Sequence, residues 1–238
     1  MKTSQYILFS FIGFIVITVL VLFIDSIGKE DYYRLPHLNE KVKLGTTIPK
    51  KHLDNFSVIV AENKADIIIR NDTINNENSI SAKLFETDSV YILPKHRIIN
   101  DTLYISKSEY AAKTLITCNT IKTVIGRDGS SIHLGTYKAD SLSIYLDKSK
   151  ITGWLSNKVI NYIAIEAYNK SDLSFSLSKT NINNSTLKVD NSQVSIAYNK
   201  KSKIQNLLAV LKNKSFISIN KVEKLEIICD TLSSYRFY

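Results

Sequence analysis

The stretch STLKVDNSQVSIAYNK, residues 185–200, contains two short runs of alternating apolar and polar residues with a small polar turn between them. Leu187 and Val189 belong to the first run, and Val194 and Ile196 belong to the second. Alternation with period two is typical of half-buried β-strands, because successive side chains of a strand point to opposite faces. The stretch therefore predicts two strands joined by a turn.

Paired strands of this kind recur along the chain at a nearly constant interval. Apolar anchors of the first strands lie 21, 24, 21 and 17 residues apart, at Ile144, Ile165, Val189, Val210 and Ile227. Anchors of the second strands lie 19, 24, 21 and 23 residues apart, at Ile132, Ile151, Phe175, Ile196 and Ile219. A period of about 21–22 residues suits one coil of a parallel β-solenoid, whose turns stack about 4.8 Å apart. We therefore predict an all-β, single-stranded parallel β-helix or solenoid over residues 53–238, with about five coils in this region; an antiparallel β-sandwich is the alternative.

Small polar residues recur where the predicted coils turn, in the segments DKSK, NKSD, DNSQ and KNKS. Asn, Asp and Ser suit such corners because they tolerate bends and hydrogen-bond to their own backbone. The segment GRDG, residues 126–129, resembles a basic phosphate-clamping loop, but the apolar alternation on both sides predicts a turn between strands. KIQNLLAVLK, residues 203–212, is the best candidate for a helix, and its Leu208-x-Val210 alternation fits a strand equally well.

The order of these segments resembles a known family. FSVIVAENKADIIIRND is followed by DTLYIS and then by units such as SLSIYLDKSKITG and STLKVDNSQVSIAY. This order is similar to that of the head GIN domain family, autotransporter adhesin-like β-solenoid proteins of Bacteroidetes. The resemblance covers about residues 53–238 and implies a right-handed β-helical head in the cell envelope. It transfers no functional residue to this chain.

An uncharged apolar run, YILFSFIGFIVITVLVLFI, occupies residues 6–24. At about 1.5 Å per residue, it nearly spans a hydrocarbon core of about 30 Å. A cleavable signal peptide usually has an apolar region of about 7–15 residues followed by small residues, whereas this run is longer and is followed by IDSIGKED. We therefore predict an uncleaved transmembrane anchor, a signal-anchor, at residues 1–25, in contact with the lipid bilayer through residues 6–24. Residues 26–52 are predicted to form a juxtamembrane linker.

The charges beside this run bear on its orientation. Only Lys2 precedes the run, whereas four cations follow it: Lys29, Arg34, Lys41 and Lys43. The positive-inside rule alone would keep the large domain in the cytoplasm, but long domains translocate largely regardless of charge. We predict a single-pass protein of the bacterial inner membrane with a periplasmic C-terminal domain.

Charge and cysteine usage narrow the classes of partner. The 238 residues include 31 Lys and Arg against 22 Asp and Glu, a formal net charge of +9. The cations are scattered singly, so we predict a mildly basic surface and no nucleic-acid partner.

The two cysteines, Cys118 and Cys229, are predicted to be small core residues in strands. Stacking of about five coils would separate them by about 24 Å, too far for a disulfide.

The residues that could carry chemistry form no recognisable constellation. The four histidines, His37, His52, His96 and His133, have no metal-ligand spacing, and no Walker, Rossmann or GxSxG segment occurs, so we predict no metal and no cofactor. The acidic residues Asp140, Asp147, Glu166, Asp172 and Asp190 lie near corners without one fixed phase. The aromatic residues Tyr145, Trp154, Tyr162, Tyr168 and Tyr198 could offer stacking faces to sugars, but strand packing is the simpler interpretation.

The sequence therefore indicates a membrane-anchored, non-enzymatic envelope protein whose solenoid presents a surface for adhesion or for protein or glycan binding. No catalytic, cofactor-binding or metal-binding residue is predicted. The alternative is a polysaccharide lyase or hydrolase on the same scaffold, which would need clustered carboxylates or a basic residue beside a groove.

Overall fold

The computed structural model describes residues 32–33, 42–47, 50–71, 77–85, 94–107, 111–137, 140–156, 159–198, 202–220 and 222–238. Contacts divide the chain into two units, residues 1–46 with 85–88 and residues 47–84 with 89–238. In the first unit, β1 (Tyr32–Tyr33) pairs antiparallel with the start of β2 (Val42–Thr47). The predicted anchor at residues 6–24 lies outside the described residues, and among the described ones there is no helix long and apolar enough to cross a membrane. The predicted domain boundaries stay predictions.

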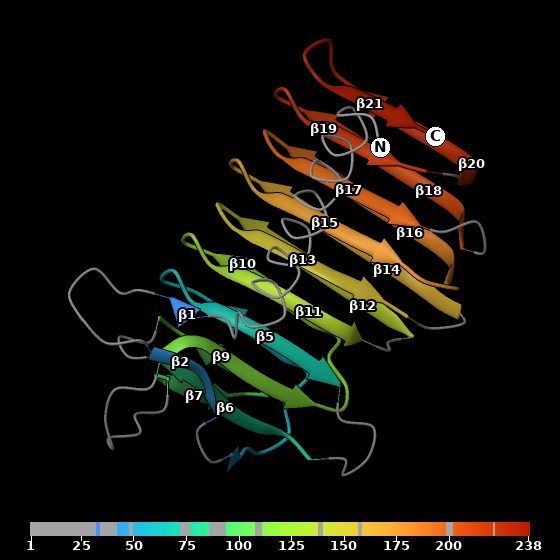
Figure 1. Cartoon of the computed structure of the whole chain (residues 1–238). Coiled ribbons are helices and arrows are strands. Elements are labelled where there is room, and N and C mark those ends of the chain that lie inside the picture. Colours follow the sequence, from blue (N-terminus) through green and yellow to red (C-terminus); the bar gives the residue numbers. More distant parts are fainter. Residues whose placement is uncertain are drawn as a thin grey trace, which may run out of the picture. The chain divides into compact units, whose positions relative to one another are not determined.

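The second unit is built from two β-sheets (Figure 1). In order, the nine-stranded sheet contains β20 (Val222–Cys229), β18 (Lys203–Lys212), β16 (Asn181–Asp190), β14 (Val159–Tyr168), β12 (Ser141–Asp147), β10 (Thr123–Arg127), β4 (Val58–Ala61), β8 (Thr102–Ile105) and β7 (His96–Ile99). The other sheet contains, in order, β6 (Ser79–Phe85), β9 (Ala111–Cys118), β5 (Asp66–Asn71), β11 (Ser131–Tyr137), β13 (Lys150–Leu155), β15 (Asp172–Leu177), β17 (Gln193–Tyr198), β19 (Phe216–Ile219) and β21 (Ser234–Phe237), with β3 (Lys51–His52) beside β6.

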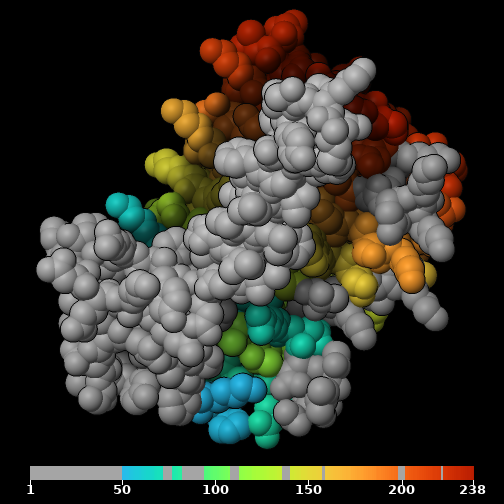
Figure 2. Space-filling view, in the orientation of Figure 1, coloured from blue at the N-terminus to red at the C-terminus, as the bar shows by residue number. Residues whose placement is uncertain are grey.

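From β10 to β21 the chain alternates strictly between the two sheets, so each coil contributes one strand to each sheet. Neighbouring strands in this run are parallel, and their inward side chains form one continuous apolar core. Figure 1 shows these strands stacked in the order of the sequence, and Figure 2 shows the same order at the surface as colours from green to red. The predicted all-β solenoid is confirmed, the antiparallel sandwich is wrong for this region, and the right-handed sense stays a prediction.

The predicted ladders are correct in period and partly wrong in register. Ile144 pairs with Ile165 as predicted, but Ile165 pairs with Leu187 and not with Val189. Val210 lies beside Lys188 on the outer face, while the inward neighbour of Leu187 is Ala209. Phe175 in the second ladder is likewise two residues beyond Leu173, the partner of Ile151. Inward positions recur every second residue, so spacing alone does not distinguish between candidates two residues apart.

The order of coils differs from the order of the sequence at one end of the solenoid. β4 lies between β8 and β10, and β5 lies between β9 and β11, so the first coil in sequence is the second in space. Antiparallel strands cover this end, since β7 pairs with β8 and β6 pairs with β9. At the other end, β20 and β21 are the terminal strands of their sheets.

The polar corners are confirmed, and serine side chains connect them. The Asn169–Lys170 corner has φ values of 56° and 68°, a left-handed conformation that Asn adopts more readily than most residues. The next residue, Ser171, is buried, and its Oγ accepts a hydrogen bond from the Ser149 N–H at 3.2 Å. The Ser192 Oγ accepts from the Ser171 N–H at 3.0 Å, one coil further on. Hydrogen bonds from serine side chains therefore connect the corners of neighbouring coils.

The remaining predictions for single segments have mixed outcomes. Asp128 and Gly129 of GRDG lie in the turn between β10 and β11, with Gly129 at a φ of 78°, whereas Gly126 and Arg127 are the last residues of β10. Residues 203–212 form β18. Both cysteines are free thiols. Cys118 is buried in β9, and burial raises its pKa to about 12. The prediction that Cys229 is a core residue is wrong, because it lies exposed in the terminal strand β20.

Candidate functional site

The outer face of the nine-stranded sheet carries side chains aligned in rows across the coils. Parallel pairing places Tyr145, Glu166, Lys188, Val210 and Ile228 side by side, one from each strand from β12 to β20. A second row contains Ser141, Tyr162, Asn184, Asn206 and Lys224. The rows bring together residues about 22 positions apart in sequence, and they mix aromatic, amide and charged groups.

An ion pair and three tyrosines lie on this face, and we call them the aromatic cluster: Glu166, Lys188, Tyr145, Tyr162 and Tyr168. The Tyr145 and Tyr168 ring centroids are 5.4 Å apart, and the Tyr168 hydroxyl donates to Glu166 Oε2 at 3.0 Å. Lys188 Nζ donates to Glu166 Oε1 at 2.8 Å. The Lys188 ammonium holds the pKa of Glu166 below its usual range, whereas burial, followed by the bond to Glu166, raises the pKa of Tyr168 to about 12. Tyr145 and Tyr162 are 39% and 40% exposed, so part of each side chain is accessible to a ligand.

A shallow groove of about 360 Å³ continues from these tyrosines over β16, β18 and β20. It is lined by Asn184, Ser185, Thr186, Asn206, Leu207, Leu208, Lys224, Leu225 and Glu226. The Tyr162 hydroxyl lies 2.8 Å from Thr186 Oγ1, which links the aromatic cluster to the groove. The lining offers amide donors and acceptors, one base, one acid and apolar contact area.

The groove follows a bend that recurs in consecutive strands. In β16, Ile182 and Ser185 are buried while the two residues between them point outward, and the same pattern recurs in β14 and β18. Amide side chains stack along this bend: Asn183 Nδ2 donates to Asn161 Oδ1, and Asn206 Nδ2 donates to Asn184 Oδ1, both at 3.1 Å. Each amide pair leaves further donor and acceptor capacity that a ligand could use.

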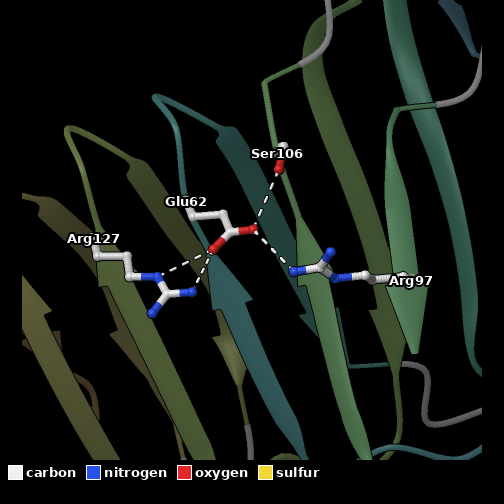
Figure 3. A network of polar contacts seen from close by, with 4 residues as sticks. All are labelled: Glu62, Arg97, Ser106 and Arg127. Carbon is white, nitrogen blue, oxygen red and sulfur yellow. Dashed lines mark hydrogen bonds and ion pairs between the residues drawn. The ribbon is translucent and has the colours of Figure 1, made fainter. Parts of the chain in front are cut away.

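A second polar cluster lies on the same sheet, at the ends of β4, β7, β8 and β10. Figure 3 shows Glu62 between two arginines that approach from opposite sides. Arg127 Nε donates to Glu62 Oε2 at 3.1 Å, and this bond raises the pKa of the Arg127 guanidinium. Arg97 Nη2 is 3.9 Å from Glu62 Oε1, and Ser106 Oγ is 3.5 Å from the same oxygen.

The structure brings only some of the sequence candidates together. Tyr145, Tyr162, Tyr168 and Glu166 share the aromatic cluster. Asp140 and Asp172 are outside it, and Asp172 pairs with Lys150 on the other sheet at 3.3 Å. Asp147 and Asp190 lie at strand ends, where they accept from Asn169 and Asn213. Trp154 lies exposed on the other sheet, and the side chain of Tyr198 is outside the described part.

The asparagines along the bend beside the groove were not among the predicted residues. Their signal is present in the sequence as Asn161, Asn183 and Asn206, which recur at about the coil period. Each of them follows a buried Ile by one or two residues.

The described histidines do not come together as a site. His52 Nδ1 lies 3.5 Å from Glu77, His133 Nδ1 lies 3.1 Å from Thr152 Oγ1, and His37 is outside the described ranges. Within those ranges, no group of three or more His, Cys, Asp or Glu residues is placed to hold a metal ion.

The comparison with solved structures shows a similar fold. One similar structure is that of a "putative adhesin" from Bacteroides fragilis NCTC 9343. The match covers 81% of this chain and 97% of the adhesin chain, with a TM-score of 0.55 and 11% sequence identity. The two chains share a fold. At this identity the likeness concerns the fold alone. A "putative lipid binding protein" from Parabacteroides distasonis ATCC 8503 is similar over 81% of this chain and 96% of its own, with a TM-score of 0.43 and 12% identity. No protein-family model matches the chain, and no curated protein matches it in sequence.

Proposed function

We propose that this chain is a non-enzymatic adhesin-like protein that binds saccharides through the outer face of the nine-stranded sheet. The observation that carries the proposal is the continuity of accessible tyrosine rings with an amide-lined groove of about 360 Å³. Sugar rings present one apolar face and a rim of hydroxyls, which suits an aromatic surface beside amide donors and acceptors. The fold shared with a protein named an adhesin is compatible with this role.

The pKa of Glu166 does not suit the general acid of a glycoside hydrolase. A general acid in a glycoside hydrolase needs a raised pKa so that it carries a proton near neutral pH. The pKa of Glu166 is lowered by Lys188, so this carboxylate stays ionised. Its role is to orient Lys188 and Tyr168 on the binding face.

A glycan array probed with the full chain in a neutral detergent, followed by calorimetric titration of the best saccharide, tests this proposal. We expect Tyr162→Ala and Asn206→Ala to weaken binding by about tenfold, through loss of ring contact and of one amide. Trp154→Ala is the matched control, because it removes a more exposed aromatic ring, 63% exposed, from the other sheet. Equal losses in all three variants, or saccharide cleavage abolished by Glu166→Gln, would contradict the proposal.

We also propose that the chain belongs to the head GIN domain family, and that residues 6–24 anchor it in the inner membrane with the solenoid in the periplasm. The order of strand units and the uncharged apolar run support this placement. Protease treatment of intact spheroplasts should digest the solenoid while sparing a cytoplasmic marker. Digestion only after lysis would place the solenoid on the cytoplasmic side instead.

A further inference from the structure

A second recess, separate from the groove, lies beside the Glu62 cluster. It has a volume of about 220 Å³ and is lined by Glu62, Lys95, His96, Arg97, Tyr104 and Ser106. In the order of the sheet, β14, β12 and β10 separate the strands that line the groove from those that line this recess. A volume of this size is below the range of about 300–1,000 Å³ that encloses drug-sized ligands, so it suits a single chemical group.

The carboxylate in this recess is already neutralised by a neighbouring arginine. Glu62 is only 8% exposed, and Arg127 donates to its Oε2 through both Nε and a terminal nitrogen. Two charge-assisted hydrogen bonds from one guanidinium make Arg127 a strong partner for this carboxylate. Arg97 is therefore an additional cation, which the charge of Glu62 does not require.

Arg97 is held in place with its hydrogen-bond donors available. Its guanidinium carbon lies 5.0 Å from the centroid of the Tyr104 ring, and its Nη2 lies 3.9 Å from Glu62 Oε1, beyond hydrogen-bond length. Its side chain is 63% exposed. Among the described residues, the Arg97 side chain makes this ring contact and this ion pair and no hydrogen bond. The guanidinium is oriented, and its N–H groups can bind an incoming acceptor.

The hydrogen bonds of His96 place another cation beside the recess. His96 Nδ1 lies 2.7 Å from the Pro94 carbonyl oxygen, which can only accept, so Nδ1 carries the proton. His96 Nε2 then accepts from the Lys51 ammonium at 3.4 Å. Arg97 and Lys95 thus line the recess, and Lys51 of β3 lies next to it through its bond to the lining residue His96.

We propose that this recess binds a phosphate monoester, with Arg97 as the bidentate ligand and Lys95 and Lys51 as supporting charges. A guanidinium fork matches two phosphate oxygens, and an ammonium binds phosphate as a point charge. A dianion gains more than a monoanion here, because more than one cation surrounds the recess and Arg127 offsets the charge of Glu62. A free phosphorylated metabolite and a phospholipid headgroup share this chemistry.

Calorimetric titration of the full chain in neutral detergent tests the proposal with inorganic phosphate and with glycerol 3-phosphate. We expect saturable binding that weakens with added NaCl, and Arg97→Gln should weaken it by about tenfold or more. Arg97→Lys should retain part of the affinity, because the charge remains and the fork is lost. Circular dichroism of each variant verifies that it folds.

Arg236→Gln is the matched control, because the Arg236 guanidinium lies 5.8 Å from the Tyr238 ring and far along the chain from the recess. Its binding should stay within about twofold of the unchanged chain. Dihexanoyl phosphatidic acid, compared with glycerol 3-phosphate, distinguishes the sources: tighter binding of the lipid indicates a headgroup, and equal binding indicates a soluble phosphate. No saturable binding, unchanged binding in Arg97→Gln, or an equal loss in Arg236→Gln would overturn the proposal.

Discussion

Glu166 illustrates how single residues on the outer face are coupled across coils. Its two oxygens accept from Lys188, one coil away, and from Tyr168 on the same strand. These bonds favour the ionised carboxylate and lower its pKa from the ordinary value of 4.5. The Lys188 side chain is 60% exposed, so solvent and salt screen the pair, and its main effect is to fix the geometry of the binding face.

Acid should weaken the fold partly through this residue. A carboxylate whose pKa is lower in the folded than in the unfolded chain contributes stability above its unfolded pKa, and this stability is lost as the pH falls through the folded pKa. We expect the midpoint of urea unfolding to decrease less between about pH 5 and about pH 3 in Glu166→Gln than in the unchanged chain. Lys188→Gln should give the same flatter profile, and a profile identical to the unchanged chain in both variants would contradict the assignment.

At the scale of the element, the corner serines help neighbouring coils to keep their spacing. Ser171 Oγ accepts from the Ser149 N–H and donates to the Tyr168 carbonyl within its own corner. Its neighbour Ser192 repeats both roles, with its donor bond to the Asp190 carbonyl at 2.9 Å. A buried N–H needs a partner, and serine is small enough to supply one inside a tight corner.

Removing one of these hydroxyls should cost more than its size suggests. Ser171→Ala deprives the Ser149 N–H of its acceptor, and we expect a loss of about 1–3 kcal/mol in the free energy of unfolding. Ser174→Ala is the control, because Ser174 is exposed on the outer face of β15 and its loss should cost at most about 0.5 kcal/mol. Urea denaturation followed by far-ultraviolet circular dichroism measures both, and equal costs would show that the corner bonds contribute nothing special.

The elements also show where sequence reasoning succeeds and where it stops. Strand type, coil period and polar corners follow from local alternation, and these predictions hold. Register is different: Val189 and Leu187 are both apolar and inward, so only the packed structure selects Leu187 as the neighbour of Ile165. The position of β4 between β8 and β10 has no local signal at all, because strand partners are chosen by long-range pairing.

The candidate site likewise depends on long-range pairing between strands, which local sequence does not reveal. Tyr145, Tyr162 and Tyr168 are visible in the sequence, but their polar neighbours come from other coils. Thr186 meets the Tyr162 hydroxyl only because two consecutive residues point outward at the bend before it. A bend of this kind shifts the alternation by one residue, so spacing counted along a strand assigns the residues beyond it to the wrong face.

For the whole solenoid, the stability of a coil depends on having a neighbour on each side. In a stacked array each repeat contacts only the adjacent ones, so internal repeats have two interfaces and a terminal repeat has one. Leu187 lies in an internal coil between Ile165 and Ala209 and is fully buried. Leu225 occupies an inward position in the terminal strand β20 and is 43% exposed.

The same truncation in these two coils should therefore have unequal effects. Leu187→Ala removes buried methyl groups and leaves a cavity between two neighbours, at a cost of about 2–5 kcal/mol. Leu225→Ala removes a side chain that is already in contact with water, so we expect less than about half that cost. Urea denaturation gives both values, and hydrogen exchange should show faster exchange in β14 and β18 for Leu187→Ala. Equal costs would mean that the terminal coil is covered in solution, because only a second neighbour would make Leu225 as important as Leu187.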